Sequence, residues 1–480
     1  MSVDRLKLCY ALVVMSGVLH AHAMELSVYP FEDPLRSRPE VLTNGVVLPG
    51  DVQAVNCLTR QEQDAVNLKE PLALAVAVDM ALCNNAQVRS SWAAIKVQAA
   101  SVGEAKAAYL PALNATVSKL SNKNKDLAGT FPETSSEGKT KNYSLTVRLF
   151  DFGTRSANLE AANQTLNAAL ASHDATLQKV LASVIGGYFD AMTMQAAYTS
   201  RMQALELSQS TLLVTQRREK LGLAAVSDSL QAETAVARAQ LALNRAQGDR
   251  RKAFAVLLYA MGLPTGAEIL LPVELEMGAN KLASDLTEWL EEAQEKHPGI
   301  ASAKAQLLAA QAKVKASKAA GLPTIDYNRN YYENGYPNQG LNALGTGVTT
   351  AGFVLTVPLF DGFGTTYRVR GAQAQVLQNQ AQLQDTEQQV LMEVVKAYAE
   401  AQSSLDNLQA SERLLASAKA SVVSSQKRYD KGVADVLEVL STQNSLADAE
   451  QERVKCLAEW RSARLRLLAS SGVLGLNGIN

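Results

Sequence analysis

A short phrase occurs twice in this sequence, far apart. "LFDFG" begins at Leu149, and "LFDGFG" begins at Leu359, 210 residues further along the 480-residue chain. The same shift aligns several other pairs: Tyr188 with Tyr398, Gln216 with Gln426, Gly222 with Gly432, Val226 with Val436, and Leu230 with Leu440. Solenoid repeats have periods of about 20–50 residues, so this period indicates two copies of a larger unit. We predict the copies at residues 70–270 and 285–475, joined by a linker at 271–284.

The first residues have the layout of a secretory signal peptide. Arg5 and Lys7 precede the apolar run "LCYALVVMSGVL", and the small residues of "AHA" at 21–23 follow it. That run is too short for a membrane anchor, and no later run reaches the roughly 18 apolar residues of a transmembrane helix. We therefore expect residues 1–23 to be removed and residues 24–69 to form an N-terminal arm.

Three cysteines lie beyond the expected signal peptide. An oxidising compartment permits a disulfide, and Cys57 and Cys83 are the pair closest in sequence. Separate buried thiols are the alternative for these two. Cys456, on a late helix, is expected to be a small core residue.

Each copy has the same order of predicted elements. A helical stretch ends near Pro111 or Pro323, and two short alternating segments follow it. The repeated phrase then leads into an uninterrupted helical pattern that ends near Gln216 in the first copy and Asp430 in the second. A glycine turn and a return helix of about 35 residues complete the copy. A helix of about 65 residues would be about 95 Å long.

The short segments alternate apolar and polar residues, which is typical of strands with one apolar face. Four strands are predicted, at about 112–120, 143–150, 323–332 and 351–360. In the second, Tyr143, Leu145, Val147 and Leu149 share one face. A soluble sheet packed on protein and the wall of an outer-membrane barrel both fit this pattern. Four strands cannot close a barrel, and an open edge is unstable in a bilayer, so a barrel would need strands from several chains.

These patterns predict a mostly α-helical protein with a small β part. Aromatic residues make up only 5% of the chain, which is too few for several compact cores of this size. Alanine-rich helices can instead pack side by side around a hollow cylinder. A strand barrel in the outer membrane, continued by a helical barrel in the periplasm, would satisfy both the strands and the helices.

Two segments that contain the predicted glycine turns carry a family resemblance. They are "EKLGLAAVSDSLQAET" (Glu219–Thr234) and "YDKGVADVLEVLSTQN" (Tyr429–Asn444). With the proline-ended helices and the two "LFD" corners, they make the sequence resemble the TolC family of outer-membrane channel proteins. The signal peptide without a lipobox and the cysteine-bearing arm resemble the branch that serves type I toxin secretion, of the cyclolysin exporter kind.

The resemblance implies a homotrimer with a twelve-stranded outer-membrane β-barrel, a long periplasmic α-helical barrel and a C-terminal tail at 476–480. It also implies the channel-tunnel component of a tripartite export system, which docks with a periplasmic adaptor and an inner-membrane transporter, here an ABC exporter. A protein toxin would be the substrate. The alternatives are a duct for drug or metal efflux and, from another class, a secreted coiled-coil structural protein. No nucleic-acid partner is expected, because the formal net charge is −1.

The resemblance also assigns roles to residues at the two glycine turns. Four residues would dock the adaptor: Gly222, Leu223, Gly432 and Val433. Asp228 and Glu438 would form an acidic ring that favours cations and could bind a divalent ion; ordinary acidic residues at helix starts are the alternative. Ala434 and Ser441 replace a basic and an acidic residue that lock the closed tip in some family members. We therefore expect the lock to involve Arg218, Tyr429 and Lys431.

Catalytic chemistry finds no support in the sequence. His173 and His297 have no cysteine or acidic neighbours at ligand spacing, and no phosphate-binding loop or nucleophile motif occurs. We predict no enzyme activity, no metal site and no cofactor. The segments 121–142 and 333–348 are expected to be loops outside the cell that tolerate insertions.

Overall fold

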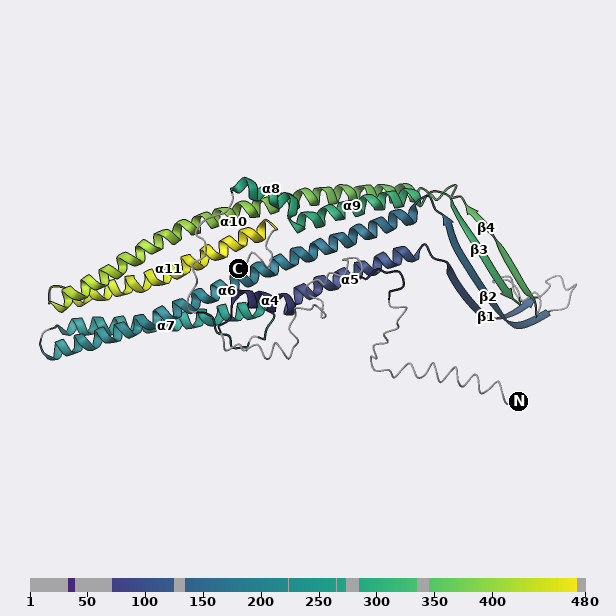
Figure 1. The fold of residues 1–480 in the computed structure, drawn as a ribbon. Coiled ribbons are helices and arrows are strands. Elements are labelled where there is room, and N and C mark those ends of the chain that lie inside the picture. Colours follow the sequence, from purple (N-terminus) through teal and green to yellow (C-terminus); the bar gives the residue numbers. More distant parts are fainter. Residues whose placement is uncertain are drawn as a thin grey trace, which may run out of the picture.

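A computed structural model describes residues 33–38, 71–124, 134–222, 224–264, 266–272, 285–334 and 345–472 of the chain. Long helices run side by side from a four-stranded sheet at one end to two hairpin turns at the other (Figure 1). The expected signal peptide, most of the N-terminal arm, the linker from residue 273 onward, and the C-terminal tail lie outside the described residues.

The helices have the same lengths in both halves of the chain. The first half contains α4 (Leu74–Asn84), α5 (Ala86–Ala107), α6 (Thr154–Lys220) and α7 (Val226–Ala260). The second contains α8 (Leu286–Lys296), α9 (Pro298–Ala319), α10 (Gly364–Asp430) and α11 (Val436–Ser470). In each half these helices have 11, 22, 67 and 35 residues. A helix of 67 residues is about 100 Å long.

The start positions of corresponding helices show where the two halves differ in length. α8 and α9 begin 212 residues after α4 and α5, whereas α10 and α11 begin 210 residues after α6 and α7. The two-residue difference therefore falls in the segment that contains the strands. Below, two residues of the long helices and hairpins are called equivalent when they are 210 positions apart.

The helical stretch that begins each half is broken, which the sequence interpretation did not anticipate. The break is at Asn85 in the first half and at His297 in the second, both in an extended conformation. Asn85 Oδ1 accepts a hydrogen bond from Gln87 N (2.8 Å), and His297 Nδ1 accepts one from Gly299 N (3.1 Å). Both residues are therefore N-caps of the following helix. Pro298 also disfavours a helical conformation for His297, which precedes it.

The four strands form one antiparallel sheet in the order β1-β2-β3-β4. They are β1 (Ala112–Asn124), β2 (Thr134–Phe150), β3 (Thr324–Glu333) and β4 (Gly347–Thr356). Residues 121–124 and 134–142, expected as part of a loop, extend β1 and β2, because backbone pairing continues past the apolar residues. β4 ends earlier than expected; Pro358, two residues beyond, has no N–H to donate to a strand ladder.

The register brings apolar residues of all four strands to one face of the sheet. Directly paired residues share a face, and the pairs include Leu113 with Leu145, Tyr143 with Tyr331, and Tyr327 with Phe353. This face is open to solvent in the single chain: Leu113 and Phe353 are each 74% exposed. On the other face, Arg148 pairs with Asp326 at 2.8 Å. Within the described chain, β1 and β4 each have one unpaired edge.

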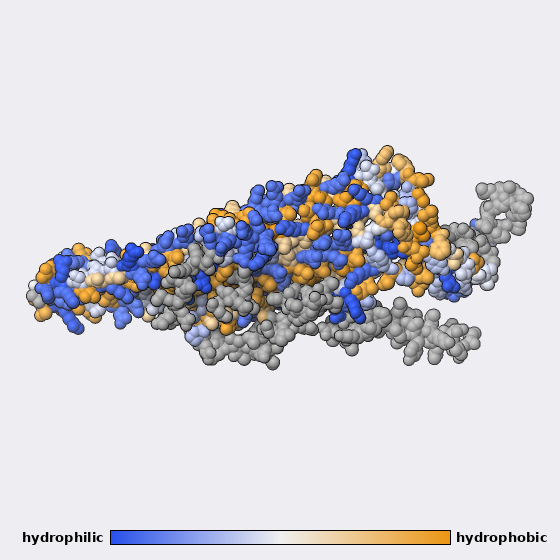
Figure 2. Space-filling view, turned by 45° about the horizontal axis from the view of Figure 1, so that its top comes forward, coloured by the Kyte–Doolittle hydropathy of each residue, from blue (hydrophilic) through white to orange (hydrophobic). Residues whose placement is uncertain are grey.

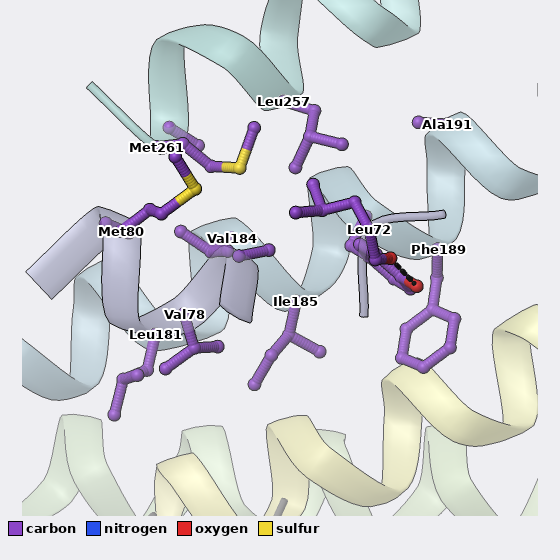
Figure 3. Packing of buried hydrophobic residues seen from close by; sticks show 14 of the residues in the cluster. Leu72, Val78, Met80, Leu181, Val184, Ile185, Phe189, Ala191, Leu257 and Met261 are labelled. Atoms are coloured by element: carbon purple, nitrogen blue, oxygen red, sulfur yellow. Dashed lines mark hydrogen bonds between the residues drawn. The ribbon is translucent and has the colours of Figure 1, made fainter. Parts of the chain in front are cut away.

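The largest buried cluster of the described residues lies where α4, α6 and α7 meet (Figure 3), about halfway along the molecule (Figure 1). Val184, Ile185, Leu257 and Met261 are fully buried there. The Tyr188 hydroxyl donates to the Leu72 carbonyl oxygen at 2.8 Å, and burial raises the pKa of Tyr188 to about 12. This hydrogen bond ties α6 to the chain segment that precedes α4.

One helical glycine and two cysteines also take part in the packing of the helices. A Cβ at Gly187 would lie 3.6 Å from Leu257 Cα, so Gly187 marks a close approach of α6 and α7. Cys456 is buried, as expected, in a second cluster with Trp289, Val394 and Trp460. Cys83 is disulfide-bonded. Cys57 lies outside the described residues, so its pairing with Cys83 stays a prediction.

Candidate functional site

The two hairpin turns lie at the end of the molecule opposite the sheet (Figure 1). We call α6 with α7 the first hairpin and α10 with α11 the second hairpin. Gly222 and Gly432 have φ values of 71° and 73°, a left-handed conformation that glycine adopts without strain. The Val433 N–H donates to the Arg428 carbonyl at 2.9 Å, and Val433 is 68% exposed. Leu223 lies outside the described residues.

Equivalent arginines make different contacts at the two turns. Arg428 Nη1 donates to Glu438 Oε1 at 2.7 Å, so this ion pair closes the second hairpin on itself. Arg218, its equivalent, reaches from the first hairpin to the second. Its two terminal nitrogens lie 3.3 and 3.4 Å from the Tyr429 carbonyl oxygen, and its guanidinium lies 4.2 Å from the Tyr429 ring centroid. Arg218 therefore links the two hairpins.

The two tip carboxylates also differ. Asp228 Oδ2 accepts from the backbone N–H of Ala225 at 3.3 Å, in the first turn of α7. Among the described residues it has no cationic partner, whereas Glu438 is paired with Arg428. In the second hairpin, Asp435 caps α11 by accepting from Glu438 N at 3.0 Å. Asp228 thus retains a charge that no side chain of its own described chain balances.

Polar contacts continue between the hairpins along α6 and α11. Arg201 Nη2 lies 3.0 Å from Asp448 Oδ1 and 2.8 Å from Gln451 Oε1. Nearer the tip, the buried side chains of Thr211 and Gln443 lie within 3.3 Å of each other. We call the contacts of Arg201, Thr211 and Arg218 with the second hairpin the inter-hairpin seam. Separating the hairpins would break every contact in this seam.

Of the three residues expected to lock the tip, the structure brings Arg218 and Tyr429 together. Lys431 is exposed and follows α10, and no side-chain contact of it is found in the described part of the chain. Ala434 packs against the tip cluster of Tyr429, Val436, Val439 and Leu440. The sequence interpretation gave no role to Arg428, although it is the residue 210 positions after Arg218.

The described residues contain neither a candidate membrane-spanning helix nor a candidate metal cluster. No helix there is long and apolar enough to span a bilayer. No group of three or more His, Cys, Asp or Glu side chains there could hold a metal ion. His173 is fully buried, and its Nδ1 lies 2.7 Å from Ser91 Oγ. His297 caps α9, so the structure gives both histidines local structural contacts.

Long paired helices joined to a small antiparallel sheet define a class of outer-membrane channel proteins, and comparison with known proteins agrees. The outer membrane efflux protein family matches residues 77–263 and again residues 289–473, and the chain belongs to this family. Protein CyaE of Bordetella pertussis is 33% identical over 411 residues, which cover 86% of each chain. The alkaline protease secretion protein AprF of Pseudomonas aeruginosa is 24% identical over 306 residues, 62% of each chain.

Solved structures support the same fold. The crystal structure of a membrane protein from Pseudomonas aeruginosa superposes with a TM-score of 0.73 at 23% identity, and covers 83% of this chain and 93% of its own. The resemblance to the TolC family is confirmed. The protein is an outer-membrane channel protein, and its helical part lies in the periplasm.

Proposed function

We propose that three copies of the chain assemble into one continuous duct across the outer membrane and the periplasm. The observation that carries this proposal is the sheet: four strands, two unpaired edges, and one face that gathers apolar residues of all four strands, with Arg329 among them. Unpaired strand edges are costly in a bilayer, and pairing β4 of one copy with β1 of the next removes them all. Three copies would give twelve strands, and each chain would contribute two copies of one ancestral unit.

The duct would be the outer-membrane component of a tripartite export system. A periplasmic adaptor and an inner-membrane ABC exporter would deliver the substrate, a protein toxin secreted by the type I route. The alkaline protease secretion protein AprF is the relative reported above whose name supports a protein substrate. A duct for small-molecule efflux is the second candidate, which the description of the family favours. A secreted coiled-coil protein would not account for the family match.

The hairpin tips would form the periplasmic gate. We infer that the inter-hairpin seam holds the closed state and that opening separates the two hairpins. Four residues of the glycine turns would receive the adaptor: Gly222, Leu223, Gly432 and Val433. Gly222, Gly432 and Val433 are exposed in the single chain. The carboxylates of Asp228 and Glu438 from three chains would line the narrowest part of the duct and favour cations. Lys431 remains a candidate for a contact between chains.

The acidic ring is tested by ion selectivity. In planar bilayers with a KCl gradient, we expect Asp228→Asn combined with Glu438→Gln to shift the reversal potential toward zero. Glu412→Gln, at an exposed position on α10 away from the turns, is the matched control and should leave it unchanged. A reversal potential in the double variant equal to that of the unmodified protein would contradict the acidic ring.

The assembly is tested by electron microscopy of the detergent-extracted, signal-processed protein. We expect a hollow cylinder with threefold symmetry that is longer than the helices alone, which span about 100 Å. Monomeric rods would contradict the duct. Mass spectrometry of unreduced peptides from the same sample tests the proposed Cys57–Cys83 disulfide.

A further inference from the structure

The corner after β4 exposes a larger apolar surface than the corresponding corner after β2. In the first half, Leu149 and Phe150 are each 49% exposed. Their equivalents Leu359 and Phe360 are 92% and 76% exposed, and Phe363 adds a side chain that is 62% exposed. The rings of Phe360 and Phe363 are in edge contact, with centroids 5.4 Å apart. The corner after β4 therefore carries a compact aromatic group open to its surroundings.

The first two turns of α10 add a phenol and then a guanidinium to this aromatic group. Phe363 is the residue before the first turn of α10, and Tyr367 and Arg370, three residues apart, lie along one face of the helix that follows. Tyr367 is 67% exposed, and the Arg370 guanidinium lies 5.7 Å from the centre of its ring. Over about 10 Å of helix the surface thus changes from hydrocarbon to phenol to guanidinium.

The first half has no aromatic or cationic side chain at the positions equivalent to Phe363, Tyr367 and Arg370, although its corner has an aromatic pair of its own, Phe150 with Phe152, whose ring centroids are 4.7 Å apart. Gly153 stands in place of Phe363, the buried Ala157 in place of Tyr367, and Glu160 in place of Arg370. Both corners nevertheless fold into the same strand-to-helix turn, with positive φ at Gly153 and Phe363. The aromatic and cationic side chains are therefore not required by the turn itself.

Arg370 is a cation of this corner that is free for an external anion. In the first corner, Arg155 is engaged with Asp151 at 3.0 Å and with two backbone carbonyl oxygens. In the second, Asp361 accepts hydrogen bonds from Thr365, which lower the pKa of Asp361, and nearby Arg368 lowers it further. Arg370 is exposed, and within the described chain it has neither an ion pair nor a hydrogen bond.

The patch also continues the apolar face of the sheet. Phe353 and Leu355 lie on that face of β4, and the same alternation passes through Val357 to Leu359. Apolar surface gathers at the sheet end of the molecule, where the strands meet the helices (Figure 2). In an outer-membrane protein, the junction between membrane strands and periplasmic helices is the level of the inner-leaflet headgroups. Aromatic rings, with arginines beyond them, are typical of such interfaces.

We propose that Phe363, Tyr367 and Arg370 form a binding site for a phospholipid of the periplasmic leaflet. The acyl chains lie against Leu359, Phe360 and the apolar face of the sheet, and the Arg370 guanidinium donates hydrogen bonds to the headgroup phosphate. The site rests on the proposed membrane orientation of the sheet. The exposures of this corner are those of the single chain, and in the proposed assembly the next copy pairs with β4 beside it. The continuity of the patch with the sheet face and the order of its side chains are the reasons for assigning a lipid to it instead of that copy.

Native mass spectrometry of the detergent-solubilised oligomer tests the site, with phosphatidylglycerol as the probe. We expect the unmodified protein to retain the lipid and Arg370→Gln to bind it about tenfold more weakly, because the charge-assisted hydrogen bond to the phosphate is lost. Arg370→Lys should restore part of the binding. Glu160→Gln, the equivalent substitution in the first half, is the matched control. Diacylglycerol, which lacks the phosphate, should not be retained.

Two outcomes would overturn the lipid site. One is equal retention of phosphatidylglycerol by Arg370→Gln and the unmodified protein. The other is dissociation of Arg370→Gln into monomers while the lipid is retained, which would make Arg370 a contact between copies. The masses also show whether the unmodified protein is a trimer, so failure of the proposed assembly is distinguished from failure of the lipid site. Tyr367→Phe, which keeps the ring, guards against misfolding as the cause of a loss.

Discussion

The two hairpin tips place equivalent arginines in different environments. Arg428 finds its acidic partner, Glu438, ten residues further along its own hairpin. Asp228 stands at the same distance from Arg218, but its shorter side chain turns back to the Ala225 backbone, and Arg218 binds Tyr429 of the other hairpin. The second hairpin is thus closed by its own residues, whereas the first depends on its neighbour. Two hairpins with helices of identical length therefore differ in the contacts that hold their tips.

The strand-to-helix corners show the same asymmetry, and there we expect the largest effect. Asp151 and Arg155 form an ion pair whose side chains are only 8% and 15% exposed. Asp151→Ala leaves a largely buried arginine unpaired and should lower the free energy of unfolding by about 3 kcal/mol. Asp361→Ala, at the exposed corner, should have a clearly smaller effect. Urea unfolding of the solubilised protein measures both, and equal losses would contradict a difference in burial as the cause.

Substituting Arg218 and Arg428 one at a time tests whether the two hairpin tips differ in their contribution to the closed state. Arg218→Ala should weaken the closed state by about 1–2 kcal/mol, because it removes a hydrogen bond to a carbonyl and a cation–π contact between hairpins. The open fraction, measured as conductance in planar bilayers, should rise about tenfold. Arg428→Ala disrupts only a contact within one hairpin and is the matched control. A larger conductance increase in Arg428→Ala would reverse the assignment of the gate contact.

The helix breaks at Asn85 and His297 allow a smaller, pH-dependent comparison. Burial lowers the pKa of His297, so the folded protein binds a proton there less readily than the unfolded chain. Stability from this site is therefore full above the ordinary histidine pKa of about 6.5 and is lost as the pH falls below it. Protonation also removes the Nδ1 acceptor that caps α9.

His297→Asn gives the second half the cap that the first half already has. We expect this variant to be less sensitive to acid than the unmodified protein, by up to about 1 kcal/mol between about pH 8 and pH 5. Unfolding midpoints at the two pH values measure the difference. An unchanged pH dependence would show that His297 titrates alike in the folded and unfolded states.

Much of the fold could be predicted from local sequence signals. The long helices follow from helix-forming residues without proline, and the tip turns from Gly222 and Gly432. The breaks at Asn85 and His297 were missed although a capping residue or a proline stood at each. The full length of β1 and β2 was missed because residues beyond the apolar band are polar, and only backbone pairing keeps them in the sheet.

The candidate site was only partly predictable. Arg218 and Tyr429 were expected near the gate because the family resemblance pointed to the tip, but their direct contact spans 211 residues of chain. The role of Arg428 and the internal use of Arg155 were not anticipated. Each depends on which of several nearby carboxylates or carbonyl groups lies within reach of a long side chain.

The sequence by itself determined the repeated order of elements, the approximate lengths of the long and return helices, the turn positions and the alternation of the strands. These depend on backbone preferences and on the spacing of side chains over a few residues. Only the tertiary structure decided which arginine joins the two hairpins, which corner remains open, and which strand edges are left unpaired. Those contacts arise between residues far apart in the chain. Small differences in side-chain length, such as the one methylene group between Asp228 and Glu438, decide which partner an arginine reaches.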